Sequence, residues 1–164
     1  LSAFGARPFW NSGVLGPLFL VSGMSTAAAL VALISRRHSE KELFTRIDVA
    51  LIVVEIALVA LFLINLATGT GQQIEALQSV LGGSYTLVFW VLFVGIGLLV
   101  PLLLEMLEIS GVSRKLAMLA PVLVLLGGYA LRQIMLDAGQ ESSWTSYDTQ
   151  YNSELLERLH EENP

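Results

Sequence analysis

Charged side chains inside long apolar stretches are the residues of this chain best suited to chemistry. Asp48 and Glu55 both lie in the stretch IDVALIVVEIALVALFLINLA, seven residues apart, so on a helix they share one face within about 20°. Glu55 has apolar neighbours on both sides and lies roughly 12 Å from the nearer end of this stretch by helical rise. Ionising a carboxyl group at that depth carries a large desolvation cost, so we expect Glu55 to be mostly neutral.

Two interpretations of these acids are open. In the first, Glu55 is a step on a proton path, with Asp48 as its entrance and Glu105 arriving at the same depth as Asp48 on the next long apolar stretch. In the second, Glu55 is a protonated acid hydrogen-bonded to a neighbouring helix, while Asp48, Glu105 and Glu108 form a charge belt at the membrane interface. The basic residues that could pair with such a belt are Arg46, Arg114 and Lys115.

Arg132 is a further candidate, in the stretch LAMLAPVLVLLGGYALRQIMLDAGQ and about one helical turn from the far membrane interface. A guanidinium at that depth is costly unless it snorkels to the interface or finds a partner, and the sequence leaves both possibilities open. By helical rise Arg132 lies roughly 12 Å from Glu55 in depth, so we expect no easy contact between them. Gly127 and Gly128 would let another helix or a flat ligand come close.

Four apolar stretches must position these side chains. About 20 helical residues cross a hydrocarbon core of about 30 Å, and the sequence predicts four such spans, at about 14–34, 47–67, 85–104 and 116–136. Of the 164 residues, 54% are hydrophobic and 14% charged, whereas a soluble domain has about 25% charged residues. We therefore predict an all-α polytopic membrane protein, a four-transmembrane-helix bundle over 1–140. Between the second and third spans, QQIEALQSVL is expected to form a short surface helix.

The segment 141–164 differs in composition and is predicted to be a short acidic extramembrane tail. It holds six acidic residues against one arginine. Leu155, Leu156 and Leu159 would form an apolar stripe on a short helix, which cannot build a core by itself. We expect this stripe to dock on another protein or on the membrane surface.

Residue content excludes several kinds of site. The chain has no cysteine, so it holds no disulfide, thiolate metal site or iron–sulfur cluster. Its two histidines, His38 and His160, lie outside the predicted spans, which excludes haem ligation by two histidines within the bilayer. With no nucleophile–base pair and no cluster of metal ligands, we predict no catalytic residue, no metal and no nucleic-acid partner. The sequence begins without methionine or a signal-peptide pattern, so we expect a fragment of a longer protein.

The distribution of basic residues predicts the orientation. The loop after the first span has four Lys or Arg residues and the loop after the third has two, whereas the opposite side has three. Positively charged loops favour the cytoplasmic side, so we expect both basic loops in the cytoplasm and both chain ends facing outward.

Two stretches of this sequence resemble one family of membrane subunits. RPFWNS precedes a span that contains LFLVSGMSTAAAL, and GGYALRQIMLDAGQ lies in the last span. In this order and around this number of spans, they are similar to the NrfD/polysulfide-reductase membrane-subunit family. The resemblance implies a haem-free, non-catalytic anchor in a bacterial or archaeal cytoplasmic membrane. It also implies electron exchange between membrane menaquinone or ubiquinone and a four-cluster, ferredoxin-like iron–sulfur subunit, which serves a molybdenum or tungsten oxidoreductase.

Members of that family resemble two four-helix bundles in series, and this chain is similar to the second, C-terminal one. The resemblance places the quinone pocket mostly in the first bundle, so it assigns no quinone ligand to a residue of this chain. The function we predict is therefore the second half of a quinone-interacting anchor, with proton transfer as an open additional role. The alternatives are a proton-conducting or transport helical bundle, with Glu55 in the pathway, and a purely structural anchor.

Overall fold

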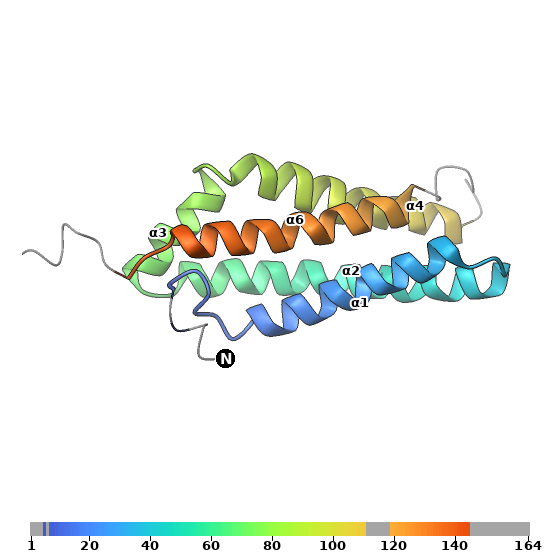
Figure 1. The fold of residues 1–164 in the computed structure, drawn as a ribbon, viewed down its shortest axis with the longest axis horizontal. Helices are drawn as coiled ribbons and strands as arrows, with labels where there is room; N and C mark the ends of the chain where they lie inside the picture. Colours follow the sequence, from blue (N-terminus) through green and yellow to red (C-terminus); the bar gives the residue numbers. More distant parts are fainter. Residues whose placement is uncertain (1–4, 6, 111–118, 145–164) are drawn as a thin grey trace, which may run out of the picture.

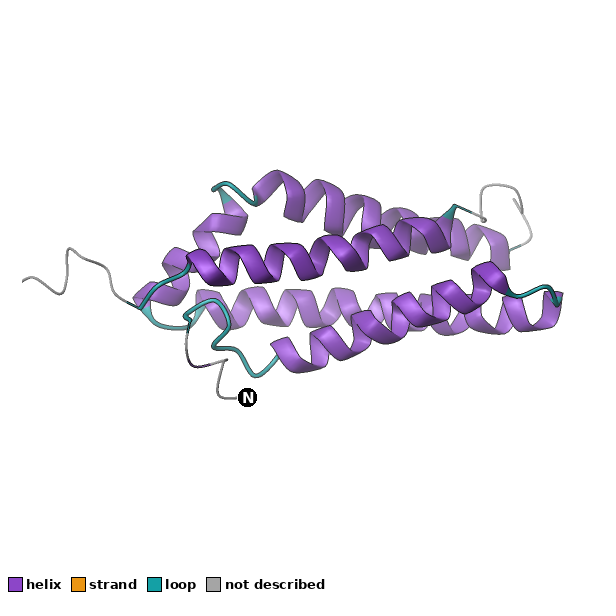
Figure 2. Cartoon of the chain, in the orientation of Figure 1, coloured by secondary structure: helices purple, strands orange, loops and turns teal. Residues whose placement is uncertain are grey.

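The computed structural model describes residues 5, 7–110 and 119–144, and within these ranges the chain is built from helices and connecting loops (Figure 2). The helices are α1 (Leu15–Ile34), α2 (His38–Ala67), α3 (Gly71–Leu81), η2 (Val88–Leu99), α4 (Val100–Ile109) and α6 (Ala120–Glu141). η2 has the wider winding of a π-helix and runs directly into α4, so the two form one continuous helix.

The long helices lie side by side in an elongated bundle (Figure 1). α1 packs against α2 and α6, and α6 packs in turn against η2. α1, α2, the joined η2–α4 helix and α6 are each long and apolar enough to cross a membrane. The predicted all-α, four-span architecture is therefore confirmed.

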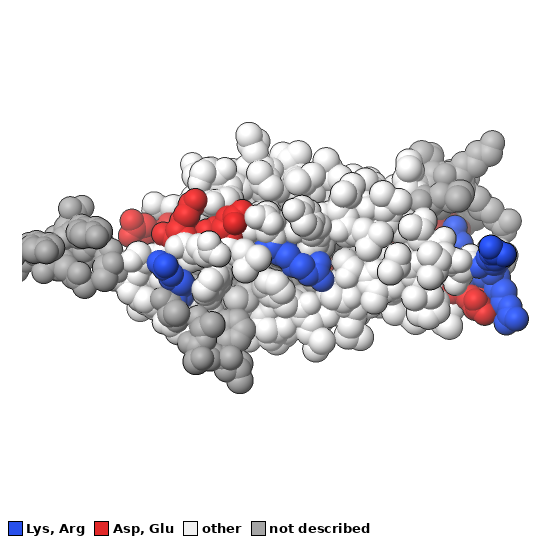
Figure 3. All heavy atoms as spheres, viewed as in Figure 1, with Lys and Arg blue, Asp and Glu red and all other residues white. Residues whose placement is uncertain are grey.

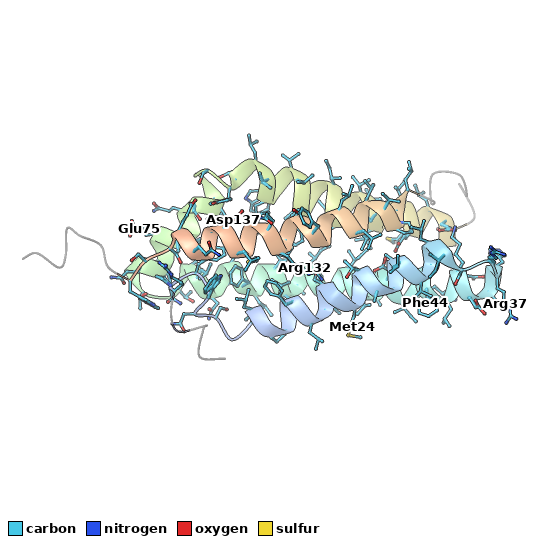
Figure 4. The ribbon with its side chains drawn as sticks, in the orientation of Figure 1. Met24, Arg37, Phe44, Glu75, Arg132 and Asp137 are labelled. Carbon is cyan, nitrogen blue, oxygen red and sulfur yellow. The ribbon has the colours of Figure 1, made fainter. Side chains whose placement is uncertain are left out.

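The long helices of the bundle expose large hydrophobic side chains, whereas a soluble protein exposes mainly polar ones. Figure 3 shows charged side chains mainly toward the two ends, with Arg132, labelled in Figure 4, as a basic side chain in the middle. Large hydrophobic side chains point outward from every long helix, among them Leu20, Leu61, Leu87, Leu103 and Leu126. Such a surface suits a hydrocarbon solvent or another membrane-embedded helix.

The observed helix ends differ from the predicted spans. α2 begins at His38, well before the span expected at 47–67, and exposed ion pairs flank this basic region, Arg46 with Glu42 at 2.7 Å and Arg37 with Glu40 at 3.3 Å. The third spanning helix is Val88–Ile109 rather than 85–104, so the acids expected after the span lie within its last turns. The fourth ends at Glu141 rather than at 136. Hydropathy locates the apolar core of a helix but not the charged turns that continue it.

Glycines allow η2 and α6 to cross in direct backbone contact. A side chain at Gly97 would collide with the backbone of Gly127, and one at Gly127 would collide with the backbone of Gly97. Small residues at such a crossing let helices approach closely. The expected close approach at Gly127 is thus confirmed, with η2 as the neighbour.

The predicted short helix between the second and third spans is also confirmed, as α3. It begins with a capping box in which Gln73 Oε1 accepts a 2.8 Å hydrogen bond from the amide of Thr70. Ala76, Leu77 and Val80 are buried, so α3 covers the end of the bundle instead of lying on its surface. The acidic tail beyond residue 144, with its leucine stripe, lies outside the described residues.

Candidate functional site

A line of polar side chains runs inside the bundle, starting at the end that carries the basic residues of α2. Its first member is an ion pair between α2 and α4, in which Lys41 Nζ lies 3.1 Å from Glu108 Oε1. Both side chains are largely enclosed, with 23% and 17% of their surface exposed. The sequence does not predict this contact, because it needs the helical extension of α2 before its apolar stretch.

Further inward, about two turns beyond Lys41 on α2 and one turn from Glu108 on α4, the carboxyl groups of Asp48 and Glu105 meet, and we call them the carboxyl pair. Asp48 is 0% exposed and Glu105 2%. The two carboxyl groups lie close enough for a hydrogen bond between them, and one oxygen of each, Asp48 Oδ2 and Glu105 Oε2, has no other partner among the described residues. Ser25 of α1 donates a short hydrogen bond of 2.6 Å from Oγ to Asp48 Oδ1. Three helices therefore converge on one pair of buried acids.

The interpretation of these acids as a charge belt at the membrane interface stays a prediction, but the two members of the carboxyl pair are buried. Both are enclosed between helices, and Arg46, one of the expected partners, pairs with Glu42 instead. Glu108, the third acid of that interpretation, has Lys41 as its partner. The other two expected partners, Arg114 and Lys115, lie outside the described residues.

Glu55 lies about two turns beyond Asp48 along α2 and is 2% exposed. It faces the interior, next to Ser22 of α1, which is also buried. The Ser22 hydroxyl forms no hydrogen bond of good geometry with any described residue, so it lies near Glu55 without holding it firmly. The sequence predicts Glu55 as a candidate because of its depth in the apolar stretch. Ser22 and Ser25 are interpreted from the sequence only as small residues that allow close helix packing.

Arg132 turns toward the middle of the bundle. Its Nη1 donates a 2.7 Å hydrogen bond to the carbonyl oxygen of Gly128, one turn earlier on α6, and Nη2 lies beside Gly23 of α1. Side chains on a helix lean toward its N-terminus, and here this direction leads away from the nearer end of α6. The described conformation is therefore not the outward snorkelling that the sequence left open.

Arg132 and Glu55 are closer than the sequence predicts. The guanidinium is near enough to act electrostatically on the Glu55 carboxyl group, although no ion pair within 4 Å forms between these two side chains. Arg132 is only half-buried. Figure 3 shows basic atoms in the apolar middle of the surface, at the place where Figure 4 labels Arg132. One side of this cation thus faces the interior acid and the other faces out of the bundle.

At the opposite end of the molecule, a cavity of about 260 Å³ opens between α3 and the end of α6. Its lining is polar and acidic and includes Gln72, Glu75, Ser79 and Glu141. Tyr85 Oη donates a 2.8 Å hydrogen bond to Glu141 Oε1, and this contact raises the pKa of Tyr85 to about 12. Among the residues that the structure describes, no group of three or more His, Cys, Asp or Glu side chains could hold a metal ion.

Comparison with known proteins identifies the family of this bundle. The sequence model of the family described as "Polysulphide reductase, NrfD" matches residues 1–142, which include every described helix. The chain belongs to the NrfD family. It is 37% identical over 150 residues to protein NrfD of Escherichia coli K12, an alignment that covers 85% of this chain and 46% of the relative. The NrfD homolog of Haemophilus influenzae is 34% identical over 149 residues, with the same coverage.

A third relative is named after a reductase. This selenate reductase subunit of Mesobacillus selenatarsenatis is 29% identical over 169 residues, covering 97% of the chain and 39% of that protein. This NrfD-family chain thus spans about half the length of the curated relatives it matches, or less. No solved structure matches it significantly. The expected family is confirmed, and the chain is a multi-pass membrane protein of that family.

Proposed function

We propose that this chain is part of a haem-free membrane anchor that links a quinone pool to a reductase complex. In this proposal, electrons pass between menaquinone or ubiquinone and an iron–sulfur partner subunit of the four-cluster, ferredoxin-like type. That partner serves a molybdenum- or tungsten-containing catalytic subunit, while this chain is itself non-catalytic. Membership of the NrfD family and the likeness to a selenate reductase subunit support the proposal.

The observation that carries the proposal is the line of buried acids inside the bundle. The reduction of a quinone consumes protons and the oxidation of a quinol releases them, so an anchor that handles quinone needs groups that move protons. Lys41 and Glu108 stand at one end of the line, the carboxyl pair follows, and Glu55 lies deepest. A purely packing role would not require acids enclosed at these positions, because ionisable groups are costly within a membrane.

We assign no quinone ligand to a described residue. Quinone rings need a slot with mostly apolar walls and a few convergent polar groups. Most residues that line the cavity between α3 and the end of α6 are polar or acidic, and the apolar ones are alanines, so it does not fit that description. The proposed contribution of this chain is therefore to transfer protons and to hold partners. The quinone pocket belongs, in this proposal, to the remaining length of the protein.

The proposed roles follow the order of the residues along the bundle. Protons enter from the basic end, which the positive-inside rule places in the cytoplasm, and reach the carboxyl pair of Asp48 and Glu105. Glu55 is the next acceptor, and Arg132 compensates the charge of Glu55 while that acid is ionised. The iron–sulfur partner would dock on the opposite, outward end of a bacterial or archaeal cytoplasmic membrane, where both chain ends are expected.

The alternative function is a proton-conducting or transport bundle, and it rests on the same line of acids without any redox partner. Purification of the complete protein from its native membrane distinguishes the two. Co-purification of a polypeptide with iron–sulfur absorbance, together with bound quinone, is the result that the anchor predicts. A stable, proton-conducting oligomer that lacks both would overturn the anchor and favour the alternative.

A further inference from the structure

The carboxyl pair has more buried acceptor oxygens than hydrogen-bond donors among the described residues. Ser25 supplies a hydrogen to Asp48 Oδ1. The other buried oxygens of the two acids, Asp48 Oδ2 and Glu105 Oε2, receive no hydrogen bond from any N–H or O–H group among the described residues. The carboxyl groups nevertheless lie within hydrogen-bonding distance of each other. A carboxylate can only accept hydrogen bonds, so these two buried oxygens can satisfy each other only if one of the acids carries a proton.

The charged groups around the carboxyl pair, counted over residues 7–110 and 119–144, do not compensate two negative charges. From α2, Lys41 is already engaged by Glu108, and Glu55 is another acid. From α4, Glu108 adds a carboxylate one turn away. From α6, Arg132 is bonded to Gly128 and acts on Glu55, and α1 contributes the neutral hydroxyl of Ser25. Two ionised acids this close together, enclosed from solvent, would repel each other, and none of the described residues places a cation between them.

We propose that Asp48 and Glu105 together form a proton-binding site that holds a single proton between their carboxyl groups. The proton comes from water at the basic end of the bundle, and the occupied pair carries one negative charge. Glu105 is the donor, because the Ser25 hydroxyl already donates to Asp48, whereas Glu105 has the Glu108 carboxylate one turn away on the same helix. The shared proton also connects α2 to α4. The inference rests on the proposed function and deepens it by making this pair the proton store at the entrance of the path.

Infrared spectroscopy of the complete protein, purified in its complex, tests the shared proton. A protonated carboxyl group has a C=O stretching band, sensitive to deuterium exchange, that a carboxylate lacks. If the proton is shared, Glu105→Gln and Asp48→Asn should each abolish the same band, because either amide can donate to the remaining acid and leave it ionised. Glu108→Gln and Glu55→Gln are the matched controls, and both should retain this band.

Other outcomes would overturn the inference. Absence of the band in the unaltered protein, or loss of the band in only one of the two variants, contradicts a shared proton. A sodium ion bound by Asp48, Glu105 and Ser25 would give no such band and would make thermal stability depend on sodium when choline replaces it. Asp48→Asn is the decisive variant, because Glu105→Gln would also remove a proton held by Glu105 alone, and the band of the unaltered protein tests the inference even if a variant does not fold. Quinol turnover is measured separately. If the band disappears in both variants as expected but turnover in Glu105→Gln is unchanged, the shared proton stands and only the proposed proton path is contradicted.

Discussion

The indole Nε1 of Trp10 donates a 2.7 Å hydrogen bond to the backbone carbonyl oxygen of Met135 on α6. This contact joins the two stretches of sequence that resemble the NrfD family, RPFWNS and GGYALRQIMLDAGQ. Arg7 strengthens the junction with a 2.8 Å hydrogen bond from Nη1 to the carbonyl oxygen of Ser142. Phe9 is fully buried and meets the ring of Phe62 edge-on at 5.4 Å between centroids. The segment before α1 therefore clamps the end of α6 onto α2.

Gly139 tests this clamp, because a side chain there would collide with the indole of Trp10. We predict that Gly139→Ala displaces the indole, breaks its bond to Met135 and destabilises the protein by about 1–3 kcal/mol, the usual cost of overpacking. The measurement is thermal unfolding of the purified complex in detergent. Gly16→Ala on α1 is the matched control, since no atom lies within 4 Å of its added carbon. Equal stability of the two variants would show that the indole of Trp10 can move aside at no measurable cost, and would contradict this prediction.

Tyr85 provides a prediction of pH dependence outside the spanning helices. Its hydrogen bond to the Glu141 carboxylate stabilises the neutral phenol and raises the pKa of Tyr85 to about 12, from an ordinary value of about 10. Ionisation of Tyr85 breaks this bond, so any stability that the bond contributes is present at lower pH and is lost as the pH rises toward 12. We expect Glu141→Gln to move the ultraviolet titration of Tyr85 toward its ordinary value, with Tyr85→Phe identifying the signal. An unchanged titration would contradict the contact.

Arg132 is predicted to support ionisation of Glu55. Arg132→Gln removes a nearby cation, so proton release by Glu55 becomes less favourable, and we expect quinol turnover to fall roughly tenfold, equivalent to about 1.4 kcal/mol. Arg132→Lys keeps the charge but not the planar donor that meets the Gly128 carbonyl, so an intermediate loss is expected. Wild-type turnover in the Gln variant would show that the guanidinium serves only packing or the outer face of the bundle.

The membrane orientation can be tested with single cysteines, since the chain has none of its own. Arg37 and Glu75 are exposed and lie at opposite ends of the bundle (Figure 4). A cysteine replacing Arg37 should react with an impermeant maleimide only from the cytoplasmic side, and one replacing Glu75 only from outside. Reaction at position 37 from outside would contradict the predicted orientation. The proposed partner would then have to dock at the other end of the bundle.

Much of the architecture could be predicted because membrane helices obey simple rules. Length and hydropathy identified four spans, and helical rise correctly brought Asp48 and Glu105 to one depth on neighbouring helices. Helical rise did not reveal the contacts of Ser25 and Ser22. Those contacts depend on how α1 is rotated and shifted against α2, and a single sequence does not contain that register.

The rest of the site could not be predicted because side-chain direction matters as much as position along a helix. Depth alone separated Arg132 from Glu55 by roughly 12 Å, but a long side chain that leans toward the N-terminus of its helix covers much of such a distance. The ion pair between Lys41 and Glu108 could not be predicted, because the sequence predicts a loop at Lys41. In the structure this residue lies in the first turns of α2. The close packing of Trp10 against Gly139 joins segments far apart in the sequence, so no local pattern of residues predicts it.

Substitution of Glu55 tests the central claim most directly, because this acid is the deepest step of the proposed proton path. Glu55→Gln keeps the shape of the side chain and most of its hydrogen bonds but cannot titrate. The measurement is quinol-driven turnover and membrane potential of the complete complex in proteoliposomes, with Glu42→Gln, an exposed acid on the same helix, as the control. We predict intact folding and quinone binding in both variants. We also predict that turnover falls about tenfold, or is uncoupled from the membrane potential, in Glu55→Gln alone. Wild-type turnover and coupling in Glu55→Gln would contradict the account and leave Glu55 as a buried hydrogen-bonding residue.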